Sequence, residues 1–346
     1  MSLCSAHQEE MAIKRMKLNY DEISPCPRPA VQLWEKLLNS SSGVATDFPT
    51  LARAVEKGVP KHRRGEAWRL LVNTRNTVET QQPSWCRHAA HDDYSLSSQP
   101  VDYENFPLLD EPYEELLGQL TSHQHAIIID LGRTFPTQKY FQASLGPGQL
   151  SLYNLLKAYS LLDSEVGYCQ GLSFIGGVLL MHLEEKEAYY MLRYLMLELG
   201  LRRQFLPDMA ALQVQLYQMA RLLRDSHRDL YEHLEENEIS PTLYAAPWFL
   251  TLFASQFSMG FVVRVFGKFC PSAIDFAVKY HPLIFPYLDL IFMSGMSMVF
   301  RVALSLIADH KDMLLQCRNF EQLMDYFKTT LPSMGASQLE RVIHEV

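Results

Sequence analysis

The chain has 346 residues, of which 48% are hydrophobic and 20% charged, and its formal net charge is −8. This composition predicts a globular protein with a sizeable core and excludes a disordered or collagen-like chain. The acidic balance argues against a protein that binds the phosphate backbone of nucleic acids. A chain of this length forms about two folding units or one large one.

The cysteines lack the close spacing of a zinc site, and the first 16 residues are too polar for a signal peptide. Free thiols fit a reducing compartment, so we expect a cytoplasmic protein. The most hydrophobic long stretch, residues 282–300, is interrupted by Pro286, Asp289 and Gly295. A membrane span needs about 20 clean apolar residues, so we interpret this stretch as core.

In chain order, residues 1–30 are polar, end in three prolines and read as a leader or linker. Residues 31–57 predict an N-terminal helical extension of two short helices, around 33–38 and 48–55, the second with a cap region at Thr46 and Asp47. Residues 77–105 are rich in Ser, Gln, His and Asp, which predicts a polar surface loop.

From residue 111 onward, apolar residues recur at helical spacing and alternating strand patterns are nearly absent, so the sequence predicts an all-α fold. Apolar steps of three and four over residues 209–234 predict one helix of six or seven turns, with a coiled-coil seam as the alternative. The sequence contains no GxxxxGK[ST], GxGxxG or HExxH motif. A self-contained nucleotide or metal enzyme is therefore not expected.

The first segment of interest runs from Ile127 to Pro136. On a helix, Asp130 and Arg133 are three residues apart and share a face with Ile127, which can anchor it. Pro136 is expected to end the helix, leaving Arg133 near the end, held by a carboxylate and free to project. The alternative is an ordinary surface ion pair.

The second segment, residues 166–171, follows the helix predicted for residues 152–162. Gly167 and Gly171 permit a tight backbone path. Tyr168 and Gln170 lie on the same side if the stretch is extended, and a glutamine amide can both donate to and accept from a water molecule. The alternative is a helix–helix loop with a buried tyrosine.

Together these segments, IxxDxxR with TxP and then YxQG, resemble the TBC (Tre-2/Bub2/Cdc16) domain of Rab GTPase-activating proteins. Other landmarks agree in order: GVP at 58–60, RGEAW at 64–68, AYS at 158–160 and PW with LF at 247–253. The resemblance covers Gly58 to Thr329 and is strongest to the Akt-substrate branch, which governs insulin-responsive glucose-transporter vesicles.

The resemblance implies an all-α domain of two helical subdomains that acts in trans on GTP-bound Rab proteins. Arg133 would be an arginine finger and Gln170 a glutamine finger that orients the attacking water. Asp130 would hold Arg133, and Tyr168 would brace the loop of Gln170. In this reading Ile127 and Gly171 support the two segments.

The resemblance also marks four motif residues as structural, Arg64, Trp68, Trp248 and Phe253, with a place on the Rab-contacting rim as the alternative for Trp248. It implies no cofactor in the chain itself, because GTP and Mg²⁺ are carried by the bound Rab. The implied partner is a Rab small GTPase, with peripheral and transient association with vesicle or endosomal membranes and no nucleic acid. In this reading the chain is a catalytic core without the flanking modules of its relatives.

One feature departs from the resemblance. Relatives of this branch continue directly from RVF into the DLIF motif, whereas here residues 267–288 separate the two. This apolar, proline-containing insertion is typical of a splice or gene-model variant. The alternative function is therefore a Rab-binding module with weak or no activity. Residues 58–329 are expected to form the domain, followed by a C-terminal tail over 330–346.

Overall fold

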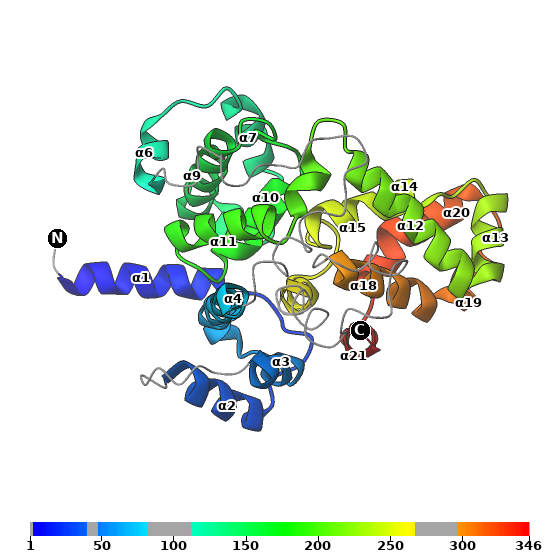
Figure 1. The fold of residues 1–346 in the computed structure, drawn as a ribbon, viewed down its shortest axis with the longest axis horizontal. Helices are drawn as coiled ribbons and strands as arrows, with labels where there is room; N and C mark the ends of the chain where they lie inside the picture. Colours follow the sequence, from blue (N-terminus) through cyan, green and yellow to red (C-terminus); the bar gives the residue numbers. More distant parts are fainter. Residues whose placement is uncertain (1–2, 40–47, 82–111, 267–295, 346) are drawn as a thin grey trace.

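The computed structural model describes residues 3–39, 48–81, 112–266 and 296–345. Within these ranges every regular element is a helix, and no strand is present (Figure 1). The predicted all-α fold is therefore confirmed. The helices form two groups, one within residues 113–205 and the other within residues 210–345, which meet where the helices of residues 172–180 and 246–251 are in contact.

The N-terminal elements are α1 (Leu3–Lys17), α2 (Arg28–Asn39), α3 (Phe48–Glu56), η1 (Lys61–Arg63) and α4 (Arg64–Gln81). The two helices predicted in the extension match α2 and α3. Residues 1–30 are not a linker, because α1 occupies half of them and Lys17 and Tyr20 are buried. The polar composition of residues 1–30 was a misleading signal, because two of their buried side chains, Lys17 and Tyr20, carry polar groups.

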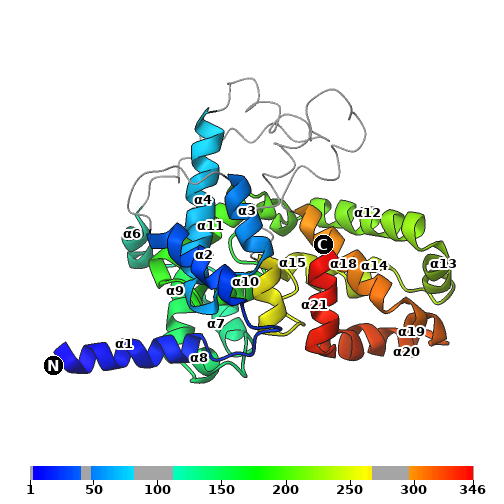
Figure 2. The ribbon, with the colours of Figure 1, turned by 90° about the horizontal axis from the view of Figure 1, so that it is seen from below.

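Tyr20 explains why this segment is held. Its hydroxyl accepts a hydrogen bond of 2.6 Å from Arg64, which also forms an ion pair of 2.5 Å with Glu22. Lys17 donates to the carbonyl of Leu183 over 3.0 Å. The hydrogen-bond needs of these buried polar groups are thus met only when residues 17–22 lie against the rest of the domain. Figure 2 shows α1 ending beside α8.

The first group comprises α6 (Tyr113–Gly118), α7 (Gln124–Leu131), α8 (Lys139–Gln142), α9 (Pro147–Leu162), α10 (Leu172–Leu180), α11 (Glu185–Leu197) and η3 (Leu201–Phe205). Helix α9 is central and contacts α6, α7, α8, α10 and α11. It starts with Pro147. Proline is favourable at this first position, because an amide there would have no hydrogen-bond partner within the helix. Leu152, Leu155, Leu156 and Tyr159 form its predicted apolar stripe, and all are buried.

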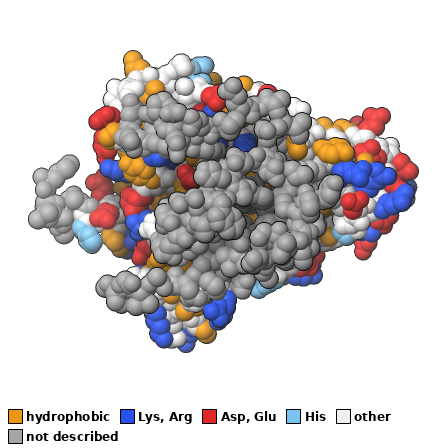
Figure 3. Space-filling model, in the orientation of Figure 1, with side chains coloured by type: hydrophobic (Ala, Val, Ile, Leu, Met, Phe, Trp, Pro, Cys, Tyr) orange, Lys and Arg blue, Asp and Glu red, His pale blue; other side chains and the backbone are white. Residues whose placement is uncertain are grey.

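The second group comprises α12 (Ala210–Ser226), α13 (Arg228–Glu236), α14 (Pro241–Tyr244), α15 (Ala246–Thr251), α18 (Met296–Asp309), α19 (Lys311–Gln316), α20 (Phe320–Asp325), η4 (Tyr326–Thr330), η5 (Leu331–Ser333) and α21 (Ala336–Glu345). The single helix predicted over residues 209–234 is wrong. The chain breaks at His227, whose φ of −141° and ψ of 65° are not helical. Figure 3 shows basic and acidic side chains intermingled at this end of the molecule.

The predicted C-terminal tail is also wrong over residues 330–345. Helix α21 packs on α18 and buries Leu339, Val342 and Ile343, while Arg341 forms an ion pair of 3.0 Å with Asp309. These apolar residues recur at spacings of three and one, the pattern of an amphipathic helix. The folded unit therefore extends past the predicted boundary at Thr329.

Three expectations lie wholly or partly outside the described residues: the cap region at Thr46 and Asp47, the polar loop after residue 81, and the insertion at 267–288. The first five residues of that loop, 77–81, belong to α4. Among the described helices, none has the length and hydropathy needed to cross a membrane.

Candidate functional site

Arg133 lies just beyond the C-terminal end of α7. The helix closes at Leu131, and the amides of Arg133 and Thr134 both point back to the carbonyl of Asp130, at 3.3 and 3.1 Å. The helix thus ends earlier than the predicted stop at Pro136. Arg133 is placed by a tight turn, and Phe135 follows with a φ of +49°.

Asp130 connects the two segments that the sequence singled out. Its side chain is only 4% exposed, whereas the Arg133 side chain with which it forms an ion pair is 49% exposed. The other carboxylate oxygen of Asp130 accepts a hydrogen bond of 2.5 Å from the phenol of Tyr168. Asp130 is a buried carboxylate that is itself fixed by Tyr168. It can therefore orient the side chain of Arg133 and still leave the guanidinium partly accessible to solvent.

Tyr168 acts as a hydrogen-bond donor in this arrangement. Burial raises the pKa of its phenol well above the usual value, and the hydrogen bond to Asp130 raises it further. The phenol therefore keeps its proton at physiological pH. Tyr168, two residues before Gln170, is therefore hydrogen-bonded to the same carboxylate that pairs with Arg133.

Thr134 adds a second link between α7 and α10. It is fully buried, and its hydroxyl lies 2.7 Å from the carbonyl oxygen of Asp130 and 2.8 Å from the hydroxyl of Ser173. Ser173 is in α10 and buried. The two segments therefore share a small polar network within an apolar core.

Gln170 is exposed in the turn that leads into α10. Gly171 follows with a φ of +113°, a conformation that L side chains rarely adopt, so glycine is needed at this position. Ile127, the predicted anchor of the first segment, is fully buried on α7. Arg133 and Gln170 are thus both exposed to solvent, whereas Asp130 and Ile127 of the same site are buried.

A cleft of about 270 Å³ opens beside Arg133. One wall is formed by Arg133, residues 135–138 and Phe174, and a second wall is formed by residues 254–259. Ile128 and Ile129 on α7, which precede Arg133 in the chain, are exposed apolar side chains. The guanidinium of Arg133 at this cleft is a donor that suits phosphate oxygens.

The four residues with predicted structural roles all lie in the core. Arg64 is buried and paired with Glu22, and Trp68, Trp248 and Phe253 are fully or almost fully buried. Trp248 donates a hydrogen bond of 2.7 Å to Gln256, at the edge of the residue 254–259 wall. Trp248 therefore packs in the interior and also holds one wall of the cleft.

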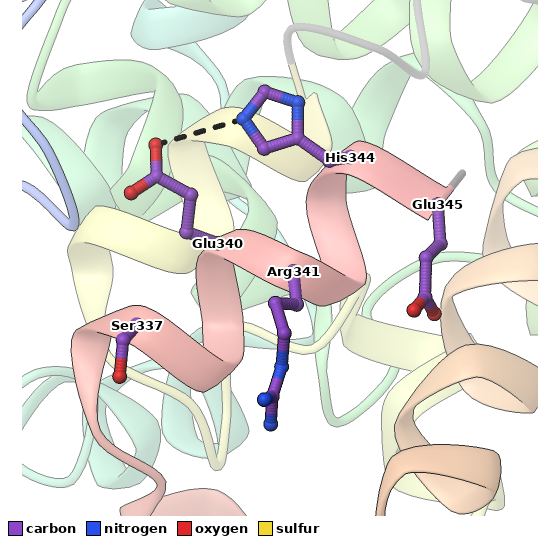
Figure 4. A pocket seen from close by; sticks show the side chains of 5 residues that line it. All are labelled: Ser337, Glu340, Arg341, His344 and Glu345. Atoms are coloured by element: carbon purple, nitrogen blue, oxygen red, sulfur yellow. Dashed lines mark ion pairs between the residues drawn. The ribbon is translucent and has the colours of Figure 1, made fainter.

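A second hollow, of about 420 Å³, is lined by one helix alone. Figure 4 shows its five side chains, Ser337, Glu340, Arg341, His344 and Glu345, all on α21, with an ion pair between Glu340 and His344. Arg341 and Glu345 have their partners on another helix, in Asp309 and Ser305 of α18, so the five side chains do not form one cluster. In the described ranges, no three His, Cys, Asp or Glu residues are grouped so that they could hold a metal ion.

Sequence reasoning recorded Thr134 only as part of the TxP motif, and it missed Asp163 and Arg202. The last two form a buried ion pair next to the Gln170 turn. Asp163 immediately precedes the second segment, and a charged residue at the end of an apolar helix was a usable signal. Arg202 lies 39 residues further on, in a short helix of ordinary sequence, and only the fold brings it near.

The sequence model of a family described as the Rab-GTPase-TBC domain matches residues 61–280. TBC1 domain family member 1 of Homo sapiens is 50% identical over 343 residues, which are 99% of this chain and 26% of that protein. TBC1 domain family member 4 of Mus musculus is 46% identical over 342 residues, 99% of this chain and 23% of that protein. The chain thus spans about a quarter of these relatives.

Among solved structures, the Ypt/Rab-GAP domain of Gyp1p superposes with a TM-score of 0.64 at 16% identity. The alignment covers 92% of this chain and 96% of that one. At this identity the likeness establishes the fold, and it does so over nearly the whole chain. The two relatives above bear out the branch that the sequence motifs indicated.

Proposed function

The chain belongs to the Rab-GTPase-TBC domain family, and we propose that it accelerates GTP hydrolysis by Rab small GTPases. Hydrolysis of GTP needs charge stabilisation and a positioned water more than covalent chemistry. An activator that works in trans must therefore present a fixed cation and a fixed polar group to its partner. Arg133 and Gln170 are the two groups that fit this description.

Arg133 is the proposed arginine finger. Its guanidinium is planar, always charged and donates in a fork that matches phosphate oxygens. Asp130 orients it in the free chain, and the half-exposed side chain can exchange this partner for the γ-phosphate of a bound nucleotide. Stabilisation of transition-state charge by such an arginine is worth about 10³–10⁵ in rate.

Gln170 is the proposed second finger. Its side-chain amide both donates and accepts, so it can hold the attacking water in line with the γ-phosphate. The turn that carries it is fixed on both sides, by Tyr168 through Asp130 and by Gly171 at the start of α10. GTP and Mg²⁺ would come with the bound Rab.

The observation that carries this proposal is the double role of Asp130. One buried carboxylate pairs with Arg133 and accepts a hydrogen bond from the phenol of Tyr168, two residues before Gln170. An ordinary surface ion pair would need no tyrosine from another segment. A shared contact on Asp130 would hold the two candidate fingers in a fixed relative position, as simultaneous action on a single nucleotide requires.

The test is phosphate release from a panel of GTP-loaded Rab proteins with and without the chain. Arg133→Ala and Gln170→Ala should each lower the accelerated rate by at least about a hundredfold, since each removes a transition-state contact. Arg221→Ala and Gln213→Ala remove the same groups from exposed positions on α12 and should leave the rate unchanged. Full activity in either finger variant would overturn the assignment.

The alternative of an inactive Rab-binding module is separated by the same assay. A variant lacking residues 267–288 runs beside the intact chain. Activity that appears only in the deletion variant would favour the binding module for the intact chain. Activity in the intact chain favours the activator, and no activity in either, together with stable binding to GTP-loaded Rab, would make binding the function.

For location, we propose a cytoplasmic chain that meets its Rab on vesicle or endosomal membranes and thereby regulates vesicle traffic. The support is indirect: a Rab activator must reach membrane-bound partners, and no described helix is long and apolar enough to span a membrane. Co-sedimentation with Rab-loaded vesicles, compared with bare vesicles of the same lipids, tests whether the partner supplies the attachment.

A further inference from the structure

The segment that carries Gln170 begins at a buried ion pair that lies outside the two motif segments. Asp163 directly follows α9, and Arg202 is in η3. Arg202 donates to both carboxylate oxygens of Asp163, from Nε to Oδ2 over 2.8 Å and from Nη2 to Oδ1 over 3.0 Å. This two-point contact fixes the orientation of the carboxylate as well as its distance.

The same carboxylate organises the turn that follows. Tyr159 donates its hydroxyl to Oδ2 over 3.0 Å, and the amide of Val166 donates to Oδ1 over 3.3 Å. The amide of Gly167 closes the turn on the carbonyl of Asp163 at 2.7 Å. Arg202 also pairs with Glu165 at 2.5 Å. Through the amides of Val166 and Gly167, Asp163 fixes the backbone just before Tyr168.

The turn is also pressed against the start of α7. Gly167 has a φ of +56°, and a Cβ at this position would lie 2.3 Å from Nε2 of His123. His123 immediately precedes α7, the helix that carries Asp130. A shift of the turn is therefore resisted both by the contacts of Arg202 and by the ring of His123.

Helix η3 contacts the second end of the segment as well. Phe205, three residues after Arg202, has its Cε1 atom 3.7 Å from the place where a side chain on Gly171 would begin. One short helix thus holds the ion pair at residue 163 and packs beside residue 171. Gln170 lies between these two contacts.

We propose that Arg202 is a positioning residue for Gln170, acting through Asp163 and the turn of residues 163–167. This inference rests on the proposed function, because it assigns Arg202 to the same reaction. Arg202 would not touch the partner or the nucleotide. It would set where the amide of Gln170 stands relative to Arg133, so its loss should slow the saturated reaction and leave partner binding intact.

The first measurement is single-turnover hydrolysis with the chain in excess over the GTP-loaded Rab that the wild-type chain accelerates most. Arg202→Lys keeps the charge and loses the two-point contact. The rate constant at saturation should fall about tenfold, while the half-saturating concentration stays within about twofold. Arg203→Lys, an exposed neighbour in η3, is the matched control and should behave as wild type.

The second measurement is amide hydrogen exchange of residues 164–170 in the free chain. Arg202→Lys should speed exchange there and leave α9 and α12 as protected as in the wild type, and Arg203→Lys should change neither. Glu165→Gln, which removes only the exposed partner of Arg202, keeps the test usable if Arg202→Lys folds poorly. It should lower the saturated rate about two- to threefold.

The outcomes separate the two proposals. A wild-type chain that accelerates no Rab would overturn the proposed function. An active wild-type chain whose saturated rate is unchanged in Arg202→Lys and in Glu165→Gln would overturn the positioning role alone. A fall in rate with unchanged exchange at residues 164–170, or with exchange raised across the whole domain, would also overturn it.

Discussion

Tyr168 and Asp130 are 38 residues apart in the chain, and the phenol of Tyr168 donates a hydrogen bond of 2.5 Å to the carboxylate of Asp130. The other oxygen of that carboxylate holds Arg133. The bond therefore ties the segment of one candidate finger to the segment of the other. Without it, each finger would be placed by its own turn only, and their separation would vary.

Tyr168→Phe should lower the saturated rate of Rab GTP hydrolysis by about tenfold, which corresponds to about 1.4 kcal/mol of barrier. The ring still packs, but Asp130 loses one of its two partners, and Arg133 and Gln170 lose their common register. Single-turnover phosphate release measures the effect. Tyr217→Phe, at an exposed tyrosine on α12, is the control. Equal rates for both variants would contradict the bridging role.

Thr134→Val should destabilise the domain by about 1–3 kcal/mol, because it removes a buried hydroxyl and leaves Ser173 without this partner. Thr134→Ser keeps the hydroxyl and should cost less. Urea unfolding of the two variants gives the comparison. If valine is as stable as wild type, the contacts to Ser173 and to the carbonyl of Asp130 contribute nothing to holding α7 on α10.

The sequence predicts local features of this site well and its long-range contacts poorly. Asp130 and Arg133 are close because they are three residues apart, and glycines at 167 and 171 announce a tight turn. Helical periodicity likewise locates α9, whose apolar stripe is buried as expected. Such features depend on a few neighbouring residues, so the pattern is readable without the fold.

Contacts between distant segments leave no such pattern. Nothing in the composition near Arg202 indicates that it pairs with Asp163, and nothing near Tyr20 indicates that Arg64 buries its hydroxyl. Polar residues read as surface when counted singly, because a buried polar group is recognised only by its partner. The same limit explains why residues 1–30 read as a linker.

Gly167→Ala should destabilise the chain by about 1–2 kcal/mol, the cost of an L side chain in the left-handed conformation. The added Cβ also collides with the ring of His123, which must rotate away. Thermal unfolding measures the loss. Gly132→Ala, at a glycine with a φ of −70° and no neighbour within 4 Å of the added Cβ, should be almost neutral. Equal losses in both variants would contradict this account.

His182 makes the stability of the domain depend on pH. It is buried between Tyr20 and Trp68, and burial, followed by nearby Arg64, Lys61 and Lys17, lowers its pKa well below 6.5. Near pH 6.5 His182 is therefore protonated to a greater extent in the unfolded chain than in the folded chain. Stability is fully present above this pH and falls as the pH drops below it.

The free energy of unfolding, measured by urea at pH 7.5 and at pH 5.5, should thus be lower at pH 5.5. His182→Gln should reduce this difference by up to about 1.4 kcal/mol for each pH unit below 6.5. His310, whose pKa is also lowered by burial, is present in both chains and cancels in the comparison. Exposed His7→Gln is the control, and an unchanged difference in His182→Gln would contradict the assignment.

Gly260→Ala tests whether the N-terminal segment is part of the folded unit. A Cβ on Gly260 would lie 2.4 Å from the carbonyl oxygen of Asp21 and 3.1 Å from the amide nitrogen of Ile23. Because both are backbone atoms, no side-chain rotation relieves the contact. Alanine favours a helix over glycine by about 1 kcal/mol, whereas overpacking costs about 1–3 kcal/mol, so the net change should be destabilising.

The measurement is the thermal unfolding midpoint together with limited proteolysis of residues 18–27. Gly260→Ala should lower the midpoint and speed cleavage there, because Tyr20 and Glu22 are drawn away from Arg64. Gly118→Ala, where an added Cβ meets nothing within 4 Å, should lower neither. A midpoint raised by Gly260→Ala would mean that helix propensity outweighs the contact, and that residues 21–23 do not pack tightly on the domain.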